Sequence, residues 1–332
     1  MEHQSFWRLK FLRLKGVNSM AIDQSLMTKE EKILFDKINR FSWMFEKNKG
    51  FLTKEERDMF RGIGLSKSSL DKINKSVDHY FMDADAETPA MRLGTAFHTL
   101  VLEPDKFAKR YVIGPDADKR SAEGKKSWKD AENANPKKTI LNISDWDMIH
   151  FMKESIDNHR RASELIDPKV GNTEETMMWN DRELQTLMKG RSDFRNNDQK
   201  VVIDLKSTVD ATKDKIERDL WSNDFRYHVQ AAIYTDGARE ILEDENWDFY
   251  FIFAQKKPPY LVQVAHLGEK ALEIGRIQYR DNILYLLDWI EKSKNKINEG
   301  VDVKEYEPIL ELHPPGWLVH KMKKQNKMVN DL

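Results

Sequence analysis

Two carboxylates and a lysine near the ends of neighbouring predicted strands have the residue types that metal-dependent phosphodiester cleavage requires. Asp204 and Lys206 follow the apolar run at residues 201–203, and strand alternation puts both side chains on one face. Buried charges at such a strand end are costly unless they are paired or bound to metal. Asp193 precedes a turn-rich link at residues 195–199, so a hairpin brings it beside Asp204. These oxygen ligands predict a site for Mg²⁺ or Mn²⁺.

The chemistry expected of this site is hydrolysis of a phosphodiester. A cation bound by Asp193, Asp204 and the carbonyl of Leu205 would polarise the phosphate and lower the pKa of a bound water. Lys206 would orient that water and offset the charge that develops on the phosphate. The alternative is a buried Asp–Lys ion pair that only holds the hairpin. The pattern alone leaves both open, because Asp-x-Lys also occurs at residues 167–169, 198–200 and 302–304.

The elements around this site predict an α/β fold with a mixed central sheet flanked by helices. Period-two and helical patterns follow one another through the second half of the chain. We expect strands at residues 176–179, 184–194, 200–207, 247–254 and 260–266, and helices at residues 212–221, 225–242 and 269–292. A Gly-rich phosphate loop is absent from the sequence, which argues against a nucleotide-driven motor.

The first half of the chain is predicted to be mostly helical. A capping box at Thr28 and Glu31 starts a helix that should stop at Gly50. Residues 1–60 are therefore expected to form an N-terminal helical extension, with residues 1–19 a disordered tail, a basic amphipathic arm or sequence ahead of a start at Met20. We also expect the following segments: a helix at 88–104, a strand at 110–113, an exposed polar excursion at 115–138, a helix at 144–166 and a basic C-terminal tail at 301–332.

Bulk composition excludes several classes of site without selecting a function. The chain has 332 residues, is 39% hydrophobic and 33% charged, and shows no apolar run long enough to span a membrane. Cys is absent, which excludes disulfides and cysteine-ligated clusters and fits a reducing cytoplasm. The net charge of −1, from 55 basic and 56 acidic residues, neither supports nor opposes DNA binding.

A series of motifs between residues 65 and 234 resembles the PD-(D/E)xK exonucleases of the exodeoxyribonuclease VIII (RecE) type. Asp193 and Asp204-Leu205-Lys206 match the position of the catalytic pair of that family. Ser192 departs from it, since the family usually has Pro there. The other landmarks are Leu65-Ser66-Lys67-Ser68-Ser69-Leu70, the helix from Gly94 through His98 to Pro104, Lys119 to Lys125, Glu174 to Trp179, and Tyr227 to Tyr234 with its Gln230 and Tyr234.

The resemblance implies a role for further residues of this chain. His98 would complete the metal shell, and Glu174 would bind a second metal or position water. Gln230 would bond near the metal site, and Tyr234, four residues on along the same helical face, would contact the strand backbone. Each also has a purely structural reading as a packed or solvated side chain. Two basic residues beside the site would contact DNA phosphates; they are Lys189 and Arg191.

The fold and activity implied by the resemblance are those of a PD-(D/E)xK exonuclease domain, here at residues 61–300. It would degrade linear double-stranded DNA from its ends, 5′→3′, with Mg²⁺ or in its place Mn²⁺, leaving 3′ single strands for recombination. The expected partners are DNA ends, a single-strand annealing protein and further copies of the chain in a ring, without a membrane. The expected setting is a phage or prophage protein in the bacterial cytoplasm.

Three alternatives stay open at this level. An endonuclease or a single-strand nuclease on the same fold would have identical site chemistry, and a non-catalytic DNA-binding recombination scaffold would retain the fold without cleavage. A metal-dependent hydrolase of another substrate is the third. Aromatic residues permit a base-stacking interpretation, but Phe249, Tyr250, Phe251 and Phe253 lie in apolar strands and are predicted to be core.

Overall fold

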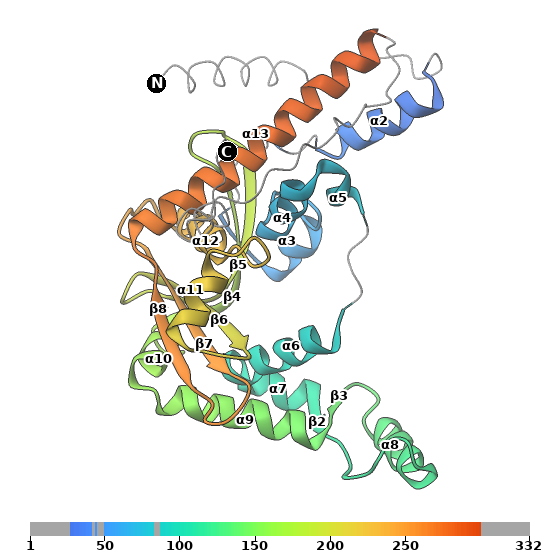
Figure 1. Cartoon of the computed structure of the whole chain (residues 1–332), viewed down its shortest axis with the longest axis vertical. Helices are drawn as coiled ribbons and strands as arrows, with labels where there is room; N and C mark the ends of the chain where they lie inside the picture. The colour runs from blue at the N-terminus through green and yellow to red at the C-terminus, as the bar shows by residue number, and fades with distance from the viewer. Residues whose placement is uncertain (1–26, 42–43, 45–49, 83–86, 300–332) are drawn as a thin grey trace, which may run out of the picture.

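The computed structural model describes residues 27–41, 44, 50–82 and 87–299 (Figure 1). The predicted N-terminal arm at residues 1–19 and the basic tail at 301–332 lie outside these residues. Within the described ranges, no helix is long and apolar enough to cross a membrane.

The central element is a six-stranded mixed sheet in the order β1-β4-β5-β6-β7-β8. Only β6 and β7 pair in parallel, and the other neighbours in this sheet are antiparallel. A separate pair, β2 and β3, is parallel. The strands are β1 (Gly50–Leu52), β2 (Tyr111–Ile113), β3 (Thr139–Leu141), β4 (Gly171–Asn180), β5 (Leu187–Asn196), β6 (Val201–Thr208), β7 (Asp248–Gln255) and β8 (Val262–His266).

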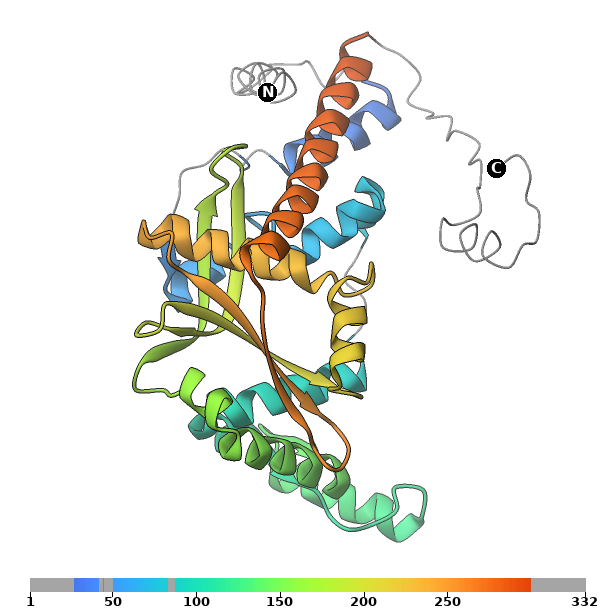
Figure 2. The same ribbon diagram turned by 60° about the vertical axis from the view of Figure 1, so that its left-hand side comes forward.

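Helices cover both faces of this sheet (Figures 1 and 2). α12 packs across β4 to β7, and α13 packs on α12 and reaches α2 and α4, while α6 and α9 pack on the other side. The helices are α2 (Lys29–Asn39), α3 (Lys54–Met59), α4 (Lys67–Lys75), α5 (Val77–Phe81), α6 (Pro89–Leu102), α7 (Pro104–Arg110), α8 (Ala122–Ala134), α9 (Ile143–Asn158), α10 (Arg160–Leu165), α11 (Lys213–Leu220), α12 (Tyr227–Leu242) and α13 (Glu269–Glu299). The predicted α/β fold, a mixed sheet flanked by helices, is confirmed.

The sheet separates two apolar cores because its strands alternate. Val202, Phe249 and Phe251 pack toward α12, whereas Ile203 and Leu205 pack toward α6 and α9. Phe249, Phe251 and Phe253 are at most 2% exposed. The predicted place of these three rings in the core is confirmed, which excludes them from base stacking, whereas Tyr250 is half-buried and packs against the other core.

Several elements differ from the sequence prediction, and the helix predicted at residues 144–166 is divided at His159 into α9 and α10. The first helix ends at Asn39 rather than near Gly50, and residues 50–52 instead form β1, which pairs with β4. Residues 115–138 include helix α8, which Ser121 caps and which buries Trp128. β3 was not predicted. These segments are short or largely polar, so their tertiary partners decide their structure. The division of the chain at residues 60 and 300 stays a prediction.

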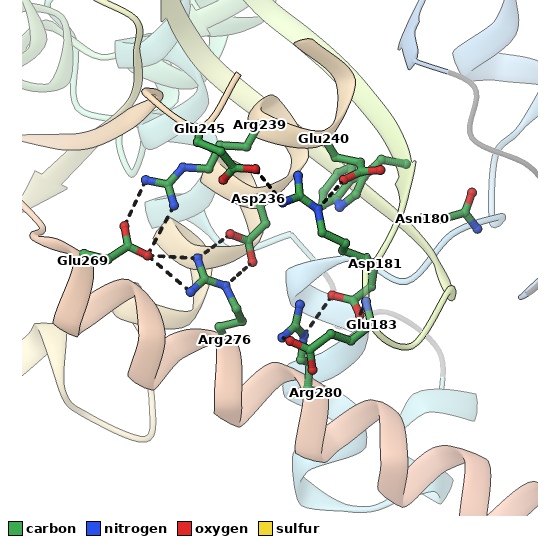
Figure 3. A pocket seen from close by; sticks show the side chains of 12 residues that line it. Asn180, Asp181, Glu183, Asp236, Arg239, Glu240, Glu245, Glu269, Arg276 and Arg280 are labelled. Carbon is green, nitrogen blue, oxygen red and sulfur yellow. Dashed lines mark hydrogen bonds and ion pairs between the residues drawn. The ribbon is translucent and has the colours of Figure 1, made fainter. Parts of the chain in front are cut away.

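A network of ion pairs fixes α13 to the rest of the fold around a cavity of about 250 Å³ (Figure 3). Arg276 makes two bonds to Asp236 of α12, at 2.8 and 2.7 Å, and Arg280 donates to Asp181 at 3.0 Å. The Tyr279 hydroxyl lies 2.8 Å from one oxygen of each carboxylate. Because these carboxylates already have protein partners, the network is structural.

Tyr279→Phe is expected to destabilise the protein by about 1–3 kcal/mol, since it removes a buried hydroxyl that bonds to two charged carboxylates, each of which then keeps its arginine partner. Chemical denaturation measures this change. Tyr285→Phe is the matched control, because Tyr285 lies on the same helix and is 48% exposed. Equal stability of the two variants would contradict the structural role of the network.

Candidate active site

The predicted hairpin is present, and its two strands separate at the predicted acidic residues. β5 and β6 pair at three positions, the last of which joins Phe194 to Ile203. Asp193 and Asp204 come next along each strand, beyond the end of this pairing. There the Leu205 N–H donates to Asp193 Oδ2 at 2.7 Å. A side-chain carboxylate thus replaces the next backbone bond, and the strands fork while β6 stays paired with β7.

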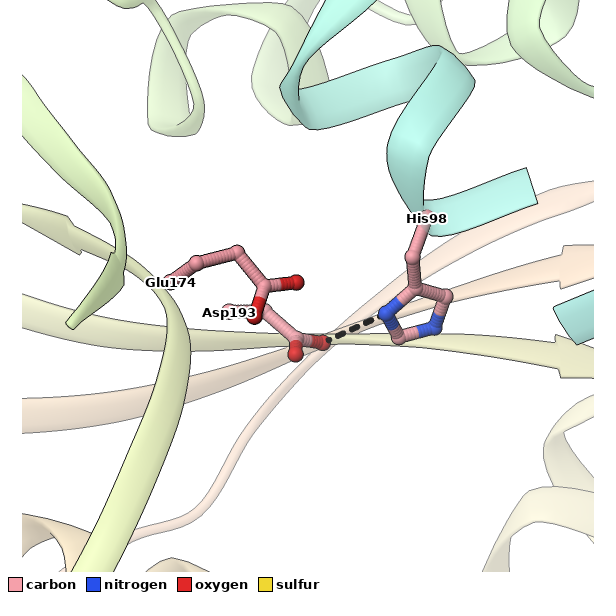
Figure 4. A group of neighbouring side chains, drawn as sticks. All are labelled: His98, Glu174 and Asp193. Atoms are coloured by element: carbon pink, nitrogen blue, oxygen red, sulfur yellow. Dashed lines mark ion pairs between the residues drawn. The ribbon is translucent and has the colours of Figure 1, made fainter. Parts of the chain in front are cut away.

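A potential metal-binding group lies at this fork (Figure 4). His98 of α6, Glu174 of β4 and Asp193 of β5 each offer one ligand atom, and these atoms lie within 4.8 Å of one another. His98 Nδ1 is 3.3 Å from Asp193 Oδ2. All three residues are half-buried. One nitrogen and two carboxylates suit a divalent cation such as Mn²⁺ or Mg²⁺.

Helix α6 carries His98 to the fork. Thr88 caps the helix by accepting from the Met91 N–H, and Pro89 occupies its first turn, where a missing N–H has no cost. The buried Ala96 and Leu100 pack in the core beneath the sheet, two residues to either side of His98. The sequence therefore anchors the helix on both sides of its histidine.

Glu174 reaches the group through a strained backbone. Its φ of 55° lies in the left-handed region, which costs a non-glycine residue about 1–3 kcal/mol. Arg191 contacts it twice: Nε donates to the Glu174 carbonyl at 3.2 Å, and Nη2 lies 2.6 Å from the Glu174 carboxylate. These contacts stabilise the conformation that brings Glu174 close to Asp193.

Beside the potential metal-binding group, the side chains of Lys206, Asp204 and Gln230 contact one another in a closed ring, here called the lysine ring. Lys206 Nζ lies 2.6 Å from Asp204 Oδ2 and donates to Gln230 Oε1 at 3.0 Å. Gln230 Nε2 in turn donates to Asp204 Oδ1. Asp204 and Lys206 thus share one face of β6, as predicted, and α12 supplies the residue that bridges them.

Burial and charge move the pKa values of the two carboxylates apart. Burial, with the charge of Asp193 close by, raises the pKa of Asp204 to about 6, although Lys206 opposes this. Burial alone would also raise the pKa of Asp193, but His98, Lys206 and the Leu205 N–H together lower it. The pKa of Lys206 is raised, because Asp204 and Asp193 outweigh its burial. Near neutral pH the site therefore holds an ionised Asp193 and a charged Lys206.

Tyr234 connects the lysine ring, through Gln230, to strand β5. Its hydroxyl bonds with the Gln230 side chain and the Arg191 backbone, and its pKa is raised, chiefly by burial. A Cβ on Gly190 would come within 2.9 Å of the Tyr234 ring, so this glycine permits the close approach. The Tyr234 ring therefore lies close to β5 at Gly190.

The structure does not gather all the predicted residues in one cluster. Asp204 pairs with Lys206 and Gln230 rather than joining the His98 group. Lys189 Nζ lies 3.4 Å from the Phe60 carbonyl, and Arg191 is bound to Glu174, so both predicted DNA contacts already have protein partners. Their role toward DNA stays a prediction.

Sequence reasoning missed a group of residues beside Lys206. Lys206 Nζ lies 5.1 Å from the centre of the Tyr227 ring. Burial lowers the pKa of Lys67, and the nearby charge of Lys206 lowers it further. Tyr227 precedes Gln230 by three residues, which puts both on one helical face. That spacing could have indicated a role for Tyr227, which begins the motif at residues 227–234. Nothing in the sequence indicated a role for Lys67 beyond its place in the motif at residues 65–70.

One comparison with known proteins identifies the family of this chain. No curated protein matches the sequence. A crystal structure from Eubacterium rectale named "Putative exonuclease" is 13% identical over 93% of this chain and 100% of its own, with a TM-score of 0.43. That score is too low to support an inference. The model of a PDDEXK-like domain of unknown function (DUF3799) matches residues 66–301, which supports the PD-(D/E)xK superfamily but not the RecE type in particular. Because this match spans more than half of the length of the chain, the chain belongs to the family of these PDDEXK-like domains.

Proposed function

We propose that this chain is a metal-dependent nuclease that hydrolyses DNA phosphodiesters at the fork between β5 and β6. The observation that carries the proposal is the meeting of two groups there. One is the set of potential metal ligands at His98, Glu174 and Asp193. The other is a lysine held at its end by Asp204 and Gln230.

Mg²⁺ is the proposed cofactor, and Mn²⁺ is expected to replace it. Asp193 and Glu174 supply the hard oxygen ligands that both ions accept, and the imidazole of His98 is a ligand that suits Mn²⁺. A bound cation would polarise the phosphate and lower the pKa of its water. The lowered pKa of Asp193 keeps this ligand ionised near neutral pH, as binding requires.

The side chains of the lysine ring would stabilise the negative charge that develops on the phosphate. Lys206 is charged and has a fixed direction, so it can donate to a phosphate oxygen as negative charge develops there. Asp204 and Gln230 hold its ammonium from two sides, which limits the reorganisation that the reaction requires. Tyr234 braces Gln230 against β5. The arrangement is thus preorganised around the position of the scissile phosphate.

The finer proposal is an exonuclease that degrades linear duplex DNA 5′→3′ and leaves 3′ single strands for phage-type recombination. Its support is the series of motifs that resembles the exodeoxyribonuclease VIII type. The same resemblance supports three further proposals: a single-strand annealing protein as partner, a ring of several copies, and action in the bacterial cytoplasm.

A comparison of linear with closed circular duplex DNA in Mg²⁺ tests the end dependence. The proposal predicts loss of the linear substrate only, with a label at the 5′ end released before a label at the 3′ end. Cleavage of circles would favour an endonuclease, and preference for single strands would favour a single-strand nuclease. DNA binding without cleavage in Mg²⁺ or Mn²⁺ would favour the recombination scaffold.

A further inference from the structure

An exposed aromatic ring is connected through a second ring to the lysine of the proposed active site. Phe225 is 42% exposed and stacks on Tyr227, with ring centres 5.1 Å apart and planes 22° from parallel. Tyr227 in turn lies beneath the ammonium of Lys206, at 5.1 Å from its ring centre. A continuous aromatic contact therefore runs from solvent to Lys206.

The backbone that presents this ring is held firmly. Arg226, between the two aromatic residues, has a left-handed φ of 47°, which is costly for a residue with a side chain. Its guanidinium is buried and bonds to Asp71 at 3.1 Å and to Asn282 at 2.9 Å. Lys67 donates to the Phe225 carbonyl at 2.6 Å. Contacts from α4 and α13 thus stabilise a strained turn that exposes Phe225.

The surroundings of Phe225 suit a nucleic-acid strand better than an apolar partner. Lys215 Nζ lies 6.0 Å from the Phe225 ring centre, Lys67 bonds to the Phe225 carbonyl, and Lys206 lies over the adjoining Tyr227 ring. Lys67 and Lys215 also pair with Asp71 and Asp219, so their net attraction for phosphate is modest. A flat exposed ring bordered by ammonium groups is the arrangement in which proteins stack a base beside its phosphate.

Exposure and stacking are not sufficient in themselves, as a second ring pair shows. Phe151 of α9 is 47% exposed and stacks on Tyr260 at 5.3 Å and 24°. Tyr260 packs against the core on the opposite face of the sheet from the core that Tyr227 contacts. What distinguishes Phe225 is its connection through Tyr227 to Lys206.

We infer that Phe225 is a stacking platform for one nucleobase of a single-stranded or frayed DNA end whose backbone enters the fork. The inference rests on the proposed nuclease function and deepens it. Phe225 positions the substrate and contacts no reacting bond. It would favour ends whose bases are unpaired, because a base must leave its own stack to reach the ring.

A double-mutant cycle between the protein and the DNA tests this inference. Duplexes with a three-nucleotide 5′ or 3′ single-stranded end carry an abasic site at each of the three positions in turn. Affinity is measured by fluorescence anisotropy in Ca²⁺ and again in EDTA, so that the DNA stays intact. We expect Phe225→Leu to bind about tenfold more weakly and Phe225→Tyr to bind as the wild type does.

The position of the stacked base should appear as one abasic site that weakens wild-type binding but not binding by Phe225→Leu. Phe151→Leu is the matched control and should retain wild-type affinity and the full effect of that abasic site. Thermal unfolding of Phe225→Leu checks that the fold is intact. If the losses from Phe225→Leu and from every abasic site simply add, the inference is wrong.

Cleavage of the same duplexes in Mg²⁺ separates this result from the proposed function. Cleavage by the wild type without coupling to any base would overturn the stacking platform and leave the nuclease standing. Coupling at one position without cleavage would support the platform and count against the nuclease. Absence of both would overturn both proposals.

Discussion

Lys206→Met is expected to lower the rate of DNA cleavage about 10²–10³-fold, the usual cost of removing one preorganised donor to developing charge. The ammonium lies between Asp204 and Gln230 and above Tyr227, so these side chains fix its direction. Met retains most of the length and apolar volume of the side chain but cannot donate. The loss should therefore appear in the rate at saturating DNA, with a much smaller change in DNA affinity.

Two controls separate this chemical role from a structural one. Lys200→Met alters an exposed lysine at the other end of the same hairpin, where it pairs with Asp244, and should leave cleavage unchanged. Lys206→Met should still respond to metal in thermal unfolding, since its potential metal ligands are intact. A rate close to that of the wild type would remove Lys206 from the proposed chemistry.

Asp193→Asn is expected to abolish both cleavage and the stabilisation of the protein by metal. Asp193 is the centre of the fork: it contacts His98, accepts from the Leu205 N–H and belongs to the potential metal-binding group. At a metal concentration of 100 times the dissociation constant, the wild type should gain about 2.7 kcal/mol. Asn is neutral and lacks the negative charge that holds the ion, so the variant should gain almost no stability from the metal.

Thermal unfolding with and without Mn²⁺ measures this difference without any dependence on activity. Asp198→Asn is the matched control, because Asp198 lies in the exposed turn of the same hairpin, and it should respond to metal as the wild type does. An equal rise in melting temperature for Asp193→Asn would show that the ion binds elsewhere.

The parts of the site that follow from local patterns could be predicted from the sequence. Alternation along residues 201–206 put Asp204 and Lys206 on one face, and the turn at 195–199 brought Asp193 to the same level of the hairpin. Helical spacing put Gln230 and Tyr234 on one side of α12. In each case the relevant distance is set by one strand, one turn or one helix.

The remaining features depend on contacts between distant segments. The place of Glu174 beside Asp193 requires a left-handed residue that Arg191 stabilises, and no strand pattern indicates such a conformation. β1 has only three residues and forms because β4 offers it a free edge. The exposure of Phe225 depends on the anchoring of Arg226 by α4 and α13, far away in the sequence.

The central claim, metal-dependent cleavage at the fork between β5 and β6, is tested most directly by a time course on end-labelled linear duplex DNA. Wild type, Lys206→Met, Asp193→Asn and Lys200→Met are compared in Mg²⁺, in Mn²⁺ and in EDTA. We predict that the wild type and Lys200→Met release nucleotides with either metal and none in EDTA, and that the two site variants are at least about a hundredfold slower. Cleavage that persists in EDTA or in both site variants, or its absence from the wild type with either metal, would contradict the account.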